Sequence, residues 1–530
     1  MTGVALFELT LLLMAVIIGL ELLARRLRMP PAAAFILGGG ALAFVPGAPN
    51  IDLDPDLALV LFLPPLLASS AYATVWRDFR ANLRIILQLA VGAVAFTTFC
   101  VGVAAHWAVP SLPWAACFAL GAIVSPPDSV AAKAVLQGLS LPPRITVLLE
   151  GESLVNDASG LVLYRFAVAA ALTGTFDAGQ AFTIFGLLAL GGVAAGAALG
   201  WCVTVLLQRL RDPTLSVVIS FLAAWAAYIG GEALHVSGVL ATVACGLVIG
   251  WRQHTVLSAE TRTQALAVWG VAVFVLESLV FILIGLSLRG VLQRLGGNWE
   301  AVHILAPTVS VIVAAVILTR FVWIIPATYV PRALSPALRR RDPYPPVSVP
   351  IVMSWAGMRG VVSLAAALAL PENFPGRDFI VATTFAVILV TVLVQGATLA
   401  PLIRVLRLGS FSLGSDKTLP EAEAGARVAA AQFAEVERHS TSDGGNTHRH
   451  PRLVEQYGYR AKAAERYSEA VNELTDAKRE HFTVVLAAIT AGRVELIRLH
   501  RAGSIHDNVL HAIERNLDLE ELGARRHLEE

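Results

Sequence analysis

Charged residues are scarce in this chain of 530 residues. Asp, Glu, Lys and Arg make up 15% of it, 56% of the residues are hydrophobic, and the mean hydropathy is +0.68. A soluble globular domain carries about 25% charged residues. The near balance of 40 Lys+Arg against 39 Asp+Glu indicates neither a nucleic-acid partner nor an anionic surface. Most of the chain is therefore expected to fold in membrane lipid.

Cysteine is also scarce, and the pattern of its positions excludes two kinds of site. The four cysteines lie inside apolar runs without C-x-x-C spacing, at Cys100, Cys117, Cys202 and Cys245. This pattern favours neither a disulfide framework nor a zinc site. The glycine run at 38–40 has no preceding strand and no following Lys, so it is not a phosphate loop. The sequence predicts no cofactor.

Long hydrophobic runs fill the first 408 residues. A bilayer core about 30 Å thick needs roughly 20 apolar residues per helix, and about thirteen runs approach that length. Their approximate spans are 4–23, 31–46, 55–74, 83–109, 112–135, 145–172, 181–208, 213–231, 236–251, 264–289, 301–328, 347–370 and 379–406. We expect an all-α polytopic membrane protein with about 13 transmembrane helices.

Arginines are unevenly distributed over the connections between these runs. The odd-numbered connections carry Arg25, Arg26, Arg28, Arg77, Arg80, Arg84, Arg144, Arg209, Arg211, Arg252, Arg262, Arg332, Arg339, Arg340 and Arg341. The even-numbered connections carry only Arg289, Arg294 and Arg377. The positive-inside rule then predicts that the N-terminus lies outside and the C-terminus in the cytoplasm. We expect a multi-pass protein of the plasma (inner) membrane, with the first run as an anchor.

The composition changes near residue 409. Residues 409–530 are rich in charge, with a polar break at about 440–451 and apolar positions at helical spacing after it. This pattern predicts a cytoplasmic helical tail, packed on itself or on a second copy. Such a tail offers a place for regulatory contacts.

The sixth run holds the densest group of ionisable and polar residues. Ionisable side chains inside membrane helices are costly, so each one is a functional candidate. The group contains Glu150, Glu152, Ser153, Asn156 and Asp157. Because Ser153 and Asp157 are one turn apart, they project from one helix face and offer hard oxygen ligands for a cation.

Two other runs contain residues that oppose a continuous helix. The fifth is interrupted by Ser125, Pro126, Pro127 and Asp128, and the twelfth by Gly357, Met358, Arg359 and Gly360. Prolines remove backbone donors and leave carbonyls free, which a membrane helix tolerates only where it is buried in protein or lines a wet cavity. The topology makes the two runs enter from opposite sides. Two broken helices of opposite direction predict an inverted-repeat secondary transporter in which they cross.

At these residues the sequence resembles the monovalent cation:proton antiporter-1 family, the NhaP-type bacterial antiporters related to the eukaryotic sodium/proton exchangers. The resemblance covers nearly all of residues 1–408, a transmembrane antiporter domain. Its most specific element is the run Glu152, Ser153, Leu154, Val155, Asn156 and Asp157. Supporting matches are Leu63 to Pro65, the stretch 232–246 and Gly357 to Gly360.

The resemblance implies a function and a role for each residue. The function is exchange of Na⁺ or Li⁺ for H⁺ by alternating access, without a catalysed reaction, and the family's proteins are typically homodimers in lipid. The implied moving core is about 83–172 and 301–406, and the remainder is interface and scaffold. The implied roles are Asp157 as ion and proton carrier, Asn156 holding it, Asp128 and Ser153 as ligands, and Glu152 paired with Arg359.

Several assignments stay open from the residues themselves. Arg320 competes with Arg359 as the partner of Glu152 or Glu150, and Glu277 is a secondary candidate in the tenth run. Near Ser69, where relatives often carry an acid, this chain has none. Because Asn156 is neutral, we expect electroneutral one-for-one exchange at Asp157.

Three alternative functions are also open. A K⁺/H⁺ exchanger would use the same site, and the alternatives from other classes are a cation channel and a membrane-embedded hydrolase.

Overall fold

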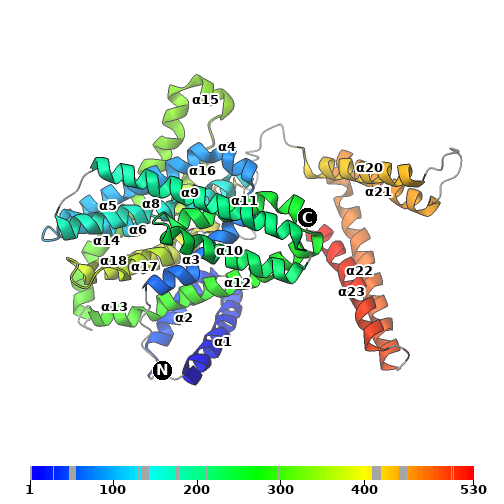
Figure 1. Cartoon of the computed structure of the whole chain (residues 1–530), viewed down its shortest axis with the longest axis horizontal. Helices are drawn as coiled ribbons and strands as arrows, with labels where there is room; N and C mark the ends of the chain where they lie inside the picture. The colour runs from blue at the N-terminus through cyan, green and yellow to red at the C-terminus, as the bar shows by residue number, and fades with distance from the viewer. Residues whose placement is uncertain are drawn as a thin grey trace. The chain divides into compact units, whose positions relative to one another are not determined.

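The computed structural model describes residues 3–27, 29–46, 55–128, 132, 142–174, 178–210, 212–294, 299–408, 419–440, 450–502, 504 and 506–529. Every secondary-structure element in these ranges is a helix. The chain forms two compact units, Met1–Gly414 and Ser415–Glu530 (Figure 1). The boundary lies close to the point where the apolar runs end in the sequence.

Within the described residues, the first unit has helix in each of the apolar runs, and the last part of the fifth run, at 129–131 and 133–135, lies outside the described residues. Its helices are α1 (Gly3–Leu27), α2 (Pro31–Ala43), α3 (Pro55–Ala73), α4 (Trp76–Leu87), the π-helical turn η1 (Gln88–Ala93), α5 (Val94–Ala108), α6 (Trp114–Val124), α8 (Pro143–Thr173), α9 (Ala178–Arg209), α10 (Pro213–Ala233), α11 (Gly238–Val256), α12 (Ala259–Leu286), α13 (Leu288–Arg294), α14 (Trp299–Leu334), α15 (Pro336–Arg341), α16 (Ser348–Trp355), α17 (Val361–Leu368), α18 (Arg377–Val390), η2 (Thr391–Gln395) and α19 (Gly396–Val405).

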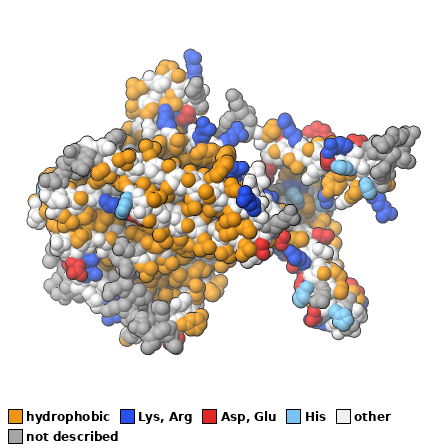
Figure 2. Space-filling view, in the orientation of Figure 1, with side chains coloured by type: hydrophobic (Ala, Val, Ile, Leu, Met, Phe, Trp, Pro, Cys, Tyr) orange, Lys and Arg blue, Asp and Glu red, His pale blue; other side chains and the backbone are white. Residues whose placement is uncertain are grey.

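Length and hydropathy identify the clearest membrane spans among these helices. Seven helices in the described part are long and apolar enough to cross a bilayer: Trp76–Ala108, Arg144–Thr173, Thr183–Arg209, Pro213–Ala233, Ala259–Arg294, Leu305–Leu334 and Arg377–Val405. Shorter apolar helices cover Pro31–Ala43, Leu57–Ala73 and Trp114–Val124. Figure 2 shows hydrophobic side chains spread widely over the surface of this unit, with few charged ones among them. Such an apolar surface fits a multi-pass membrane protein.

The helices of the first unit pack closely where small residues meet. α12 packs along α2, and α11 packs along α9 and α3. A Cβ at Gly39 would overlap the carbonyl oxygen of Ile282, and one at Gly285 would overlap that of Ile36. Only glycine allows the backbones of α2 and α12 to approach so closely. This contact fixes α12 firmly against its neighbours.

A polar cluster connects four segments at one end of this unit. The Arg144 guanidinium donates to Asn82 Oδ1 at 3.0 Å and to Asp342 Oδ1 at 2.8 Å. Arg332 Nη2 donates to Asp342 Oδ2 at 2.6 Å. Burial alone would raise the pKa of the Asp342 carboxyl, but the hydrogen bonds and charges of Arg144 and Arg332 outweigh burial and lower it. The cluster thus holds the start of α8, α4 and the end of α14 to the segment between α15 and α16.

The second unit consists of four helices. They are α20 (Glu421–Ser440), α21 (Pro451–Glu469), α22 (Val471–Arg501) and α23 (Asp507–Glu529). α20 packs on α21, and α22 packs on α23. Arg493 of α22 bridges Asp518 at 2.5 Å and Glu521 at 2.6 Å on α23. The antiparallel pairing follows the apolar spacing in the sequence.

Candidate functional site: a crossing of interrupted helices

The two interruptions predicted in the fifth and twelfth runs meet in the structure. α6 ends at Val124, immediately before Ser125 and the two prolines. The twelfth run divides into α16 and α17, separated by residues 356–360. The backbone N–H of Asp128 donates to the carbonyl of Met358 at 2.7 Å. This bond joins the extended segment of one broken helix to that of the other.

A polar face of α8 is packed against the crossing. Glu152, Ser153, Asn156 and Asp157 are all buried, with Asn156 fully so. The Asn156 side-chain amide donates to the carbonyl of Pro127 at 2.7 Å. That carbonyl is free because the helix is interrupted beyond it. Asn156 therefore connects α8 to the segment that follows α6, a contact distinct from the role of holding Asp157 that the resemblance implies.

Two aspartates and a serine line a small cavity beside the crossing. The cavity offers about 30 Å³ to the centres of water-sized molecules, enough for one small ligand of that size. One wall carries Asp128, Ser153 and Asp157, with two valines of α17. The opposite wall comes from α3 and α12 and includes Ser70 and Glu277. The structure thus brings together the three predicted ligands and the secondary candidate Glu277.

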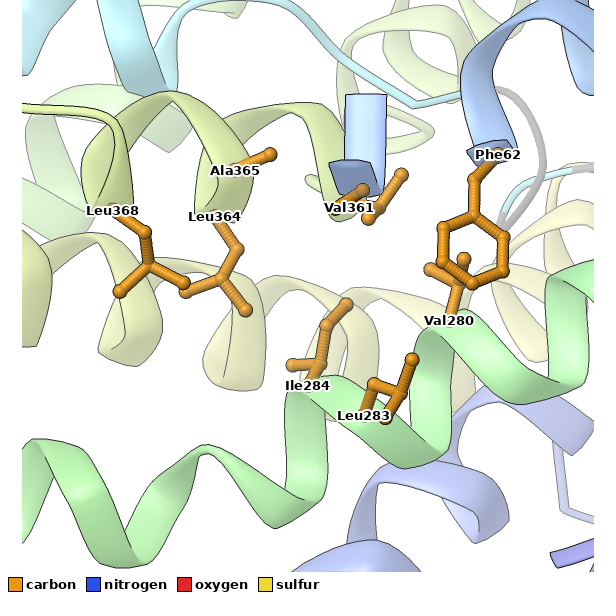
Figure 3. A pocket seen from close by; sticks show the side chains of 9 residues that line it. Phe62, Val280, Leu283, Ile284, Val361, Leu364, Ala365 and Leu368 are labelled. Carbon is orange, nitrogen blue, oxygen red and sulfur yellow. The ribbon is translucent and has the colours of Figure 1, made fainter. Parts of the chain in front are cut away.

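An apolar cavity adjoins this polar one. Figure 3 shows Phe62 of α3 and Val280, Leu283 and Ile284 of α12 opposite the α17 side chains Val361, Leu364 and Leu368. Val280 and Val361 line both cavities. The apolar contact lies toward the C-terminal ends of α12 and α17. On that side, no charged residue lines the space between the walls within the described part of the chain.

Gly360 determines how closely the Asp128 carboxylate approaches α17. A Cβ at this position would overlap Asp128 Oδ2 and crowd its Cγ. Gly360 also precedes Val361, the first residue of α17. The N-terminus of a helix carries partial positive charge, which favours an anionic side chain there. The glycine therefore allows the Asp128 carboxyl group to lie against the start of α17.

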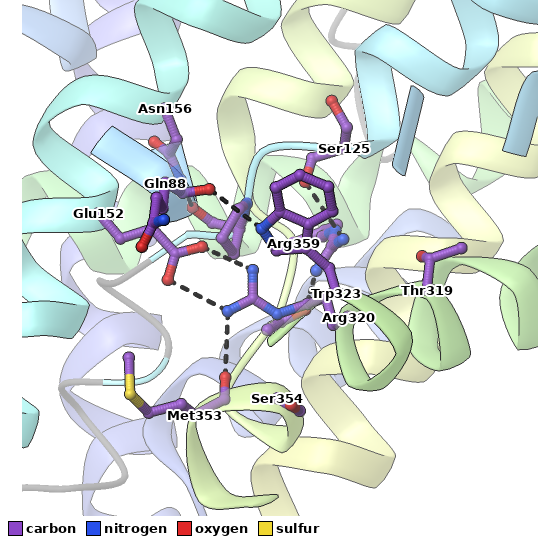
Figure 4. A network of polar contacts seen from close by, with 12 residues as sticks. Gln88, Ser125, Glu152, Asn156, Thr319, Arg320, Trp323, Met353, Ser354 and Arg359 are labelled. Carbon is purple, nitrogen blue, oxygen red and sulfur yellow. Dashed lines mark hydrogen bonds and ion pairs between the residues drawn. The ribbon is translucent and has the colours of Figure 1, made fainter. Parts of the chain in front are cut away.

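Glu152 forms an ion pair with Arg320 of α14, and not with Arg359. Arg320 Nη1 lies 2.7 Å from Glu152 Oε1, and Nη2 lies 3.1 Å from Oε2, with both side chains 2% exposed (Figure 4). Arg320 Nη2 also donates to the Met353 carbonyl at 3.0 Å, near the end of α16. The expected pair of Glu152 and Arg359 is therefore wrong, and the competing candidate Arg320 is the partner.

Arg359 instead donates to backbone carbonyls left free by the break in α6. Its Nε lies 2.7 Å from the Val124 carbonyl oxygen and its Nη2 lies 3.2 Å from that of Ser125, and Nη1 donates to Gly357 (Figure 4). The C-terminus of a helix has unpaired carbonyls and partial negative charge, which a guanidinium satisfies. This physical demand explains why Arg359 does not reach Glu152.

Other predicted or overlooked polar residues take supporting positions. Glu150 is partly buried on α8 and is not among the residues that line the cavity. The Arg359 backbone N–H donates to Thr391 Oγ1 at 3.1 Å, and Thr98 Oγ1 donates to Ser125 Oγ at 3.2 Å. These two threonines were not identified from the sequence. The only sequence feature that could have indicated them is the presence of a hydroxyl group inside an apolar run.

In the described residues, the end of α6 meets the gap between α16 and α17 beside buried carboxylates in an apolar helical unit, an arrangement typical of secondary transporters. The family model "Sodium/hydrogen exchanger, transmembrane" matches residues 11–405, which is more than half of the chain. The chain belongs to the sodium/hydrogen exchanger family. It is a membrane transporter of the cation/proton antiport class and not an enzyme.

Individual relatives agree with this assignment, and a solved structure has a similar fold. A Mycobacterium bovis protein described as an uncharacterized Na⁺/H⁺ exchanger is 34% identical over 407 residues, covering 75% of this chain and 74% of its own. A Bacillus pumilus sodium, potassium, lithium and rubidium/H⁺ antiporter is 33% identical over 413 residues, covering 75% and 61%. The sodium proton antiporter MjNhaP1 of Methanocaldococcus jannaschii has a similar fold, with a TM-score of 0.59, 17% identity, and coverage of 77% and 100%.

Proposed function

We propose that this protein exchanges Na⁺ or Li⁺ for H⁺ across the plasma (inner) membrane, one for one, with Asp157 as the group that takes up either ion. The observation that carries the proposal is the cavity lined by Asp157, Asp128 and Ser153 at the crossing. Carboxylate and hydroxyl oxygens are the ligands that hard cations prefer. Proton and cation compete because each neutralises the same carboxylate, so exchange is obligatory.

The charges at the crossing support a one-for-one stoichiometry. Arg320 and Arg359 contribute two positive charges, and Glu152, Asp128 and Asp157 contribute three negative charges when ionised. The sum is −1. A buried net charge is unfavourable, and either one monovalent cation or one proton removes it. Both loaded states are then neutral, so we expect the carrier to cross in either state without moving net charge.

Alternating access requires that the two walls of the cavity separate. We infer that residues 83–172 and 301–406 form the moving core, in a homodimer with its N-terminus outside and the tail in the cytoplasm. The aspartates lie on the core side, whereas α3 and α12 supply the opposite wall. The arginine distribution in the sequence supports this orientation. The count of about 13 membrane helices belongs to the same proposal.

A K⁺/H⁺ exchanger is the second candidate. The Bacillus pumilus relative is named for potassium and rubidium as well as sodium and lithium. Its similarity to this chain makes the choice of cation an experimental question. A channel would pass current without moving protons, and a hydrolase would move no ions.

Proton movement in everted membrane vesicles tests the proposal. Na⁺, Li⁺ and K⁺ are added in turn across a pH series while a pH dye reports dequenching. We expect Asp157→Asn to abolish the response while the protein remains in the membrane. Asp378→Asn is the matched control, because Asp378 is exposed at the start of α18. Exchange that survives in Asp157→Asn would refute the role of this residue.

The stoichiometry has its own measurement in proteoliposomes. An imposed membrane potential should leave the initial exchange rate of the wild-type protein unchanged. A rate that rises or falls with the potential would contradict one-for-one exchange.

A further inference from the structure

One ion pair connects the helix that carries Asp157 to the opposite part of the transporter. Arg165 Nη2 of α8 lies 3.1 Å from Glu232 Oε2, near the end of α10. α8 belongs to the proposed moving core, whereas α10 belongs to the remainder of the first unit, which we call the scaffold. The pair therefore joins the two parts that have to separate in alternating access.

Arg165 is a costly residue at its position in α8. It is the only charged residue between Gly160 and Leu172. A guanidinium inside a membrane helix is unfavourable unless an anionic group or water is within reach. Glu232 supplies the anionic group, and the two side chains are 57% and 37% exposed. The contact with Glu232 thus gives a physical reason for an arginine here that packing does not give.

The start of α11 holds the Glu232 carboxylate in place. Its Oε1 accepts a hydrogen bond from the Gly238 backbone N–H at 3.3 Å. α11 begins at Gly238, and a helix N-terminus carries partial positive charge that favours a carboxylate. A Cβ at Gly238 would lie 2.6 Å from the Tyr228 carbonyl oxygen and 3.1 Å from Glu232 Cγ, so the absence of a side chain leaves room for this contact. The scaffold thus orients one carboxylate oxygen and presents the other to the core.

Arg165 lies on the side of α8 that also carries Asp157. Asp157, Leu161 and Arg165 follow one another at intervals of four residues, which places them on one helix face. At about 1.5 Å per residue, Arg165 is separated from Asp157 by about 12 Å along the helix axis. In the orientation proposed above, α8 runs from the cytoplasm to the outside and α10 ends outside. The ion pair therefore lies on the outer side of Asp157.

A second ion pair between the core and the scaffold is weaker. Arg294 Nη1 of α13 and Asp378 Oδ1 of α18 are 3.9 Å apart, beyond hydrogen-bond distance, and their side chains are 39% and 58% exposed. This pair provides a comparison, because breaking it separates two charges between the core and the scaffold without the loss of a hydrogen bond.

We infer that Arg165 and Glu232 form an outer latch, which holds the core against the scaffold in the present conformation and has to open before Asp157 becomes accessible from outside. This inference rests on the proposed exchange function. The attraction exists in the latched conformation alone, so its removal shifts the population toward the outward-open conformation. A partly exposed ion pair shifts such an equilibrium by about two- to fivefold.

The ratio of the KM values for Na⁺ at the two membrane faces reports this equilibrium. The apparent affinity at each face is reduced by the fraction of protein that faces it, so the cytoplasmic KM divided by the outer KM changes by the same factor as the equilibrium. For Arg165→Gln and for Glu232→Gln, measured in everted and right-side-out vesicles, we expect this ratio to rise about two- to fivefold. Arg165→Lys, which keeps the charge, should stay close to wild type. Asp378→Asn is the matched control and should leave the ratio unchanged.

A double-mutant cycle and a labelling assay separate a latch from a general structural role. The double variant Arg165→Gln with Glu232→Gln should change the ratio no more than either single variant, because the same contact is lost in all three. In a protein whose native cysteines are replaced, Leu161→Cys should react faster with a membrane-impermeant maleimide added outside once the latch is removed. Ser111→Cys, exposed between α5 and α6, should react at the same rate with and without the latch.

Three results would overturn the inference. They are an unchanged KM ratio in both single variants, additive effects in the double variant, and KM values that move in the same direction at both faces. If only one single variant accumulates in the membrane, its KM ratio decides the test. A wild-type protein that exchanges no cation would instead refute the proposed function itself.

Discussion

The ion pair between Glu152 and Arg320 makes a sharp prediction about stability. The pair is bidentate, at 2.7 and 3.1 Å, and each side chain is 2% exposed. Replacing Arg320 by Met keeps much of the side-chain volume but leaves the Glu152 carboxylate buried without its partner. Breaking a buried ion pair in this way costs about 3–5 kcal/mol. The Met353 carbonyl also loses a donor, which places the expected value toward the upper end of that range.

A double-mutant cycle isolates the contribution of the pair. Glu152→Gln alone leaves a buried guanidinium with a weaker acceptor, so it should also destabilise the protein. The double variant Glu152→Gln with Arg320→Met removes both charges. Replacing a buried ion pair by uncharged residues often changes the stability little. We therefore expect the double variant to be more stable than Arg320→Met alone, with a coupling energy above about 1 kcal/mol.

Unfolding of the detergent-solubilised protein by added denaturing detergent provides the free energies for this cycle. The matched cycle of Glu152→Gln with Arg359→Met should show a smaller coupling, because Arg359 donates to backbone carbonyls. Contacting pairs couple by about 0.5–3 kcal/mol, whereas independent sites add within about 0.5 kcal/mol. Additive effects at Glu152 and Arg320, or stronger coupling of Glu152 to Arg359, would refute the pairing described above.

Two further predictions concern the contact between Gly360 and Asp128 and the polar cluster of Asp342. Gly360→Ala should accumulate normally but reduce the exchange rate at least about tenfold, equivalent to about 1.4 kcal/mol, because the added Cβ would displace the Asp128 carboxylate. Gly270→Ala is the control, since a Cβ at Gly270 meets no neighbour within 4 Å. Equal activity of the two variants in the dye assay would contradict the placement of Asp128. Asp342→Asn should cost about 1–3 kcal/mol at neutral pH through lost charge-assisted hydrogen bonds. Because the pKa of the Asp342 carboxyl is lowered in the folded protein, its contribution is complete above the ordinary value of about 3.9 and disappears as the pH falls through the lowered value. Denaturant titrations should therefore show a constant gap between wild type and variant from neutral pH down to about 4 and a closing gap below it, and a gap that closes near pH 6 would contradict this reasoning.

Much of the fold follows from hydropathy and from a few residues that interrupt helices. Each apolar run is helical in the described part of the chain, because a bilayer leaves the backbone no other partner than itself. The prolines after Ser125 and the glycines around Arg359 mark the two breaks, since their backbone chemistry opposes a continuous helix. Helical spacing alone places Ser153 and Asp157 on one face of α8.

The partners of the two arginines could not be deduced in the same way. Glu152 is separated from both Arg320 and Arg359 by more than 160 positions, and residue type does not distinguish the two guanidiniums. The choice depends on where the carbonyls of Val124 and Ser125 are left unpaired, and this depends on how α6 ends against its neighbours. The sequence shows which side chains are present, whereas the unpaired backbone carbonyls of Val124 and Ser125 determine where Arg359 binds. Glu277 was a weaker candidate for a similar reason, because only the packing of α12 shows which face turns to the cavity.

The crossing shows how side chains can satisfy the backbone of interrupted helices inside a membrane, next to the cavity that we propose as the transport site. Each break leaves unpaired backbone groups in a medium that supplies no water to bind them. Three side chains donate hydrogen bonds to such carbonyls: Arg359 to Val124 at the end of α6, Arg320 to Met353 in α16, and Asn156 to Pro127. Asp128 lies against the start of α17. Glu152 pairs with the Arg320 guanidinium, whereas the carboxylate of Asp157 lines the cavity together with that of Asp128. In the proposed function a cation or a proton neutralises Asp157, so the stabilisation of the broken helices and the proposed transport of one positive charge would depend on the same group of residues.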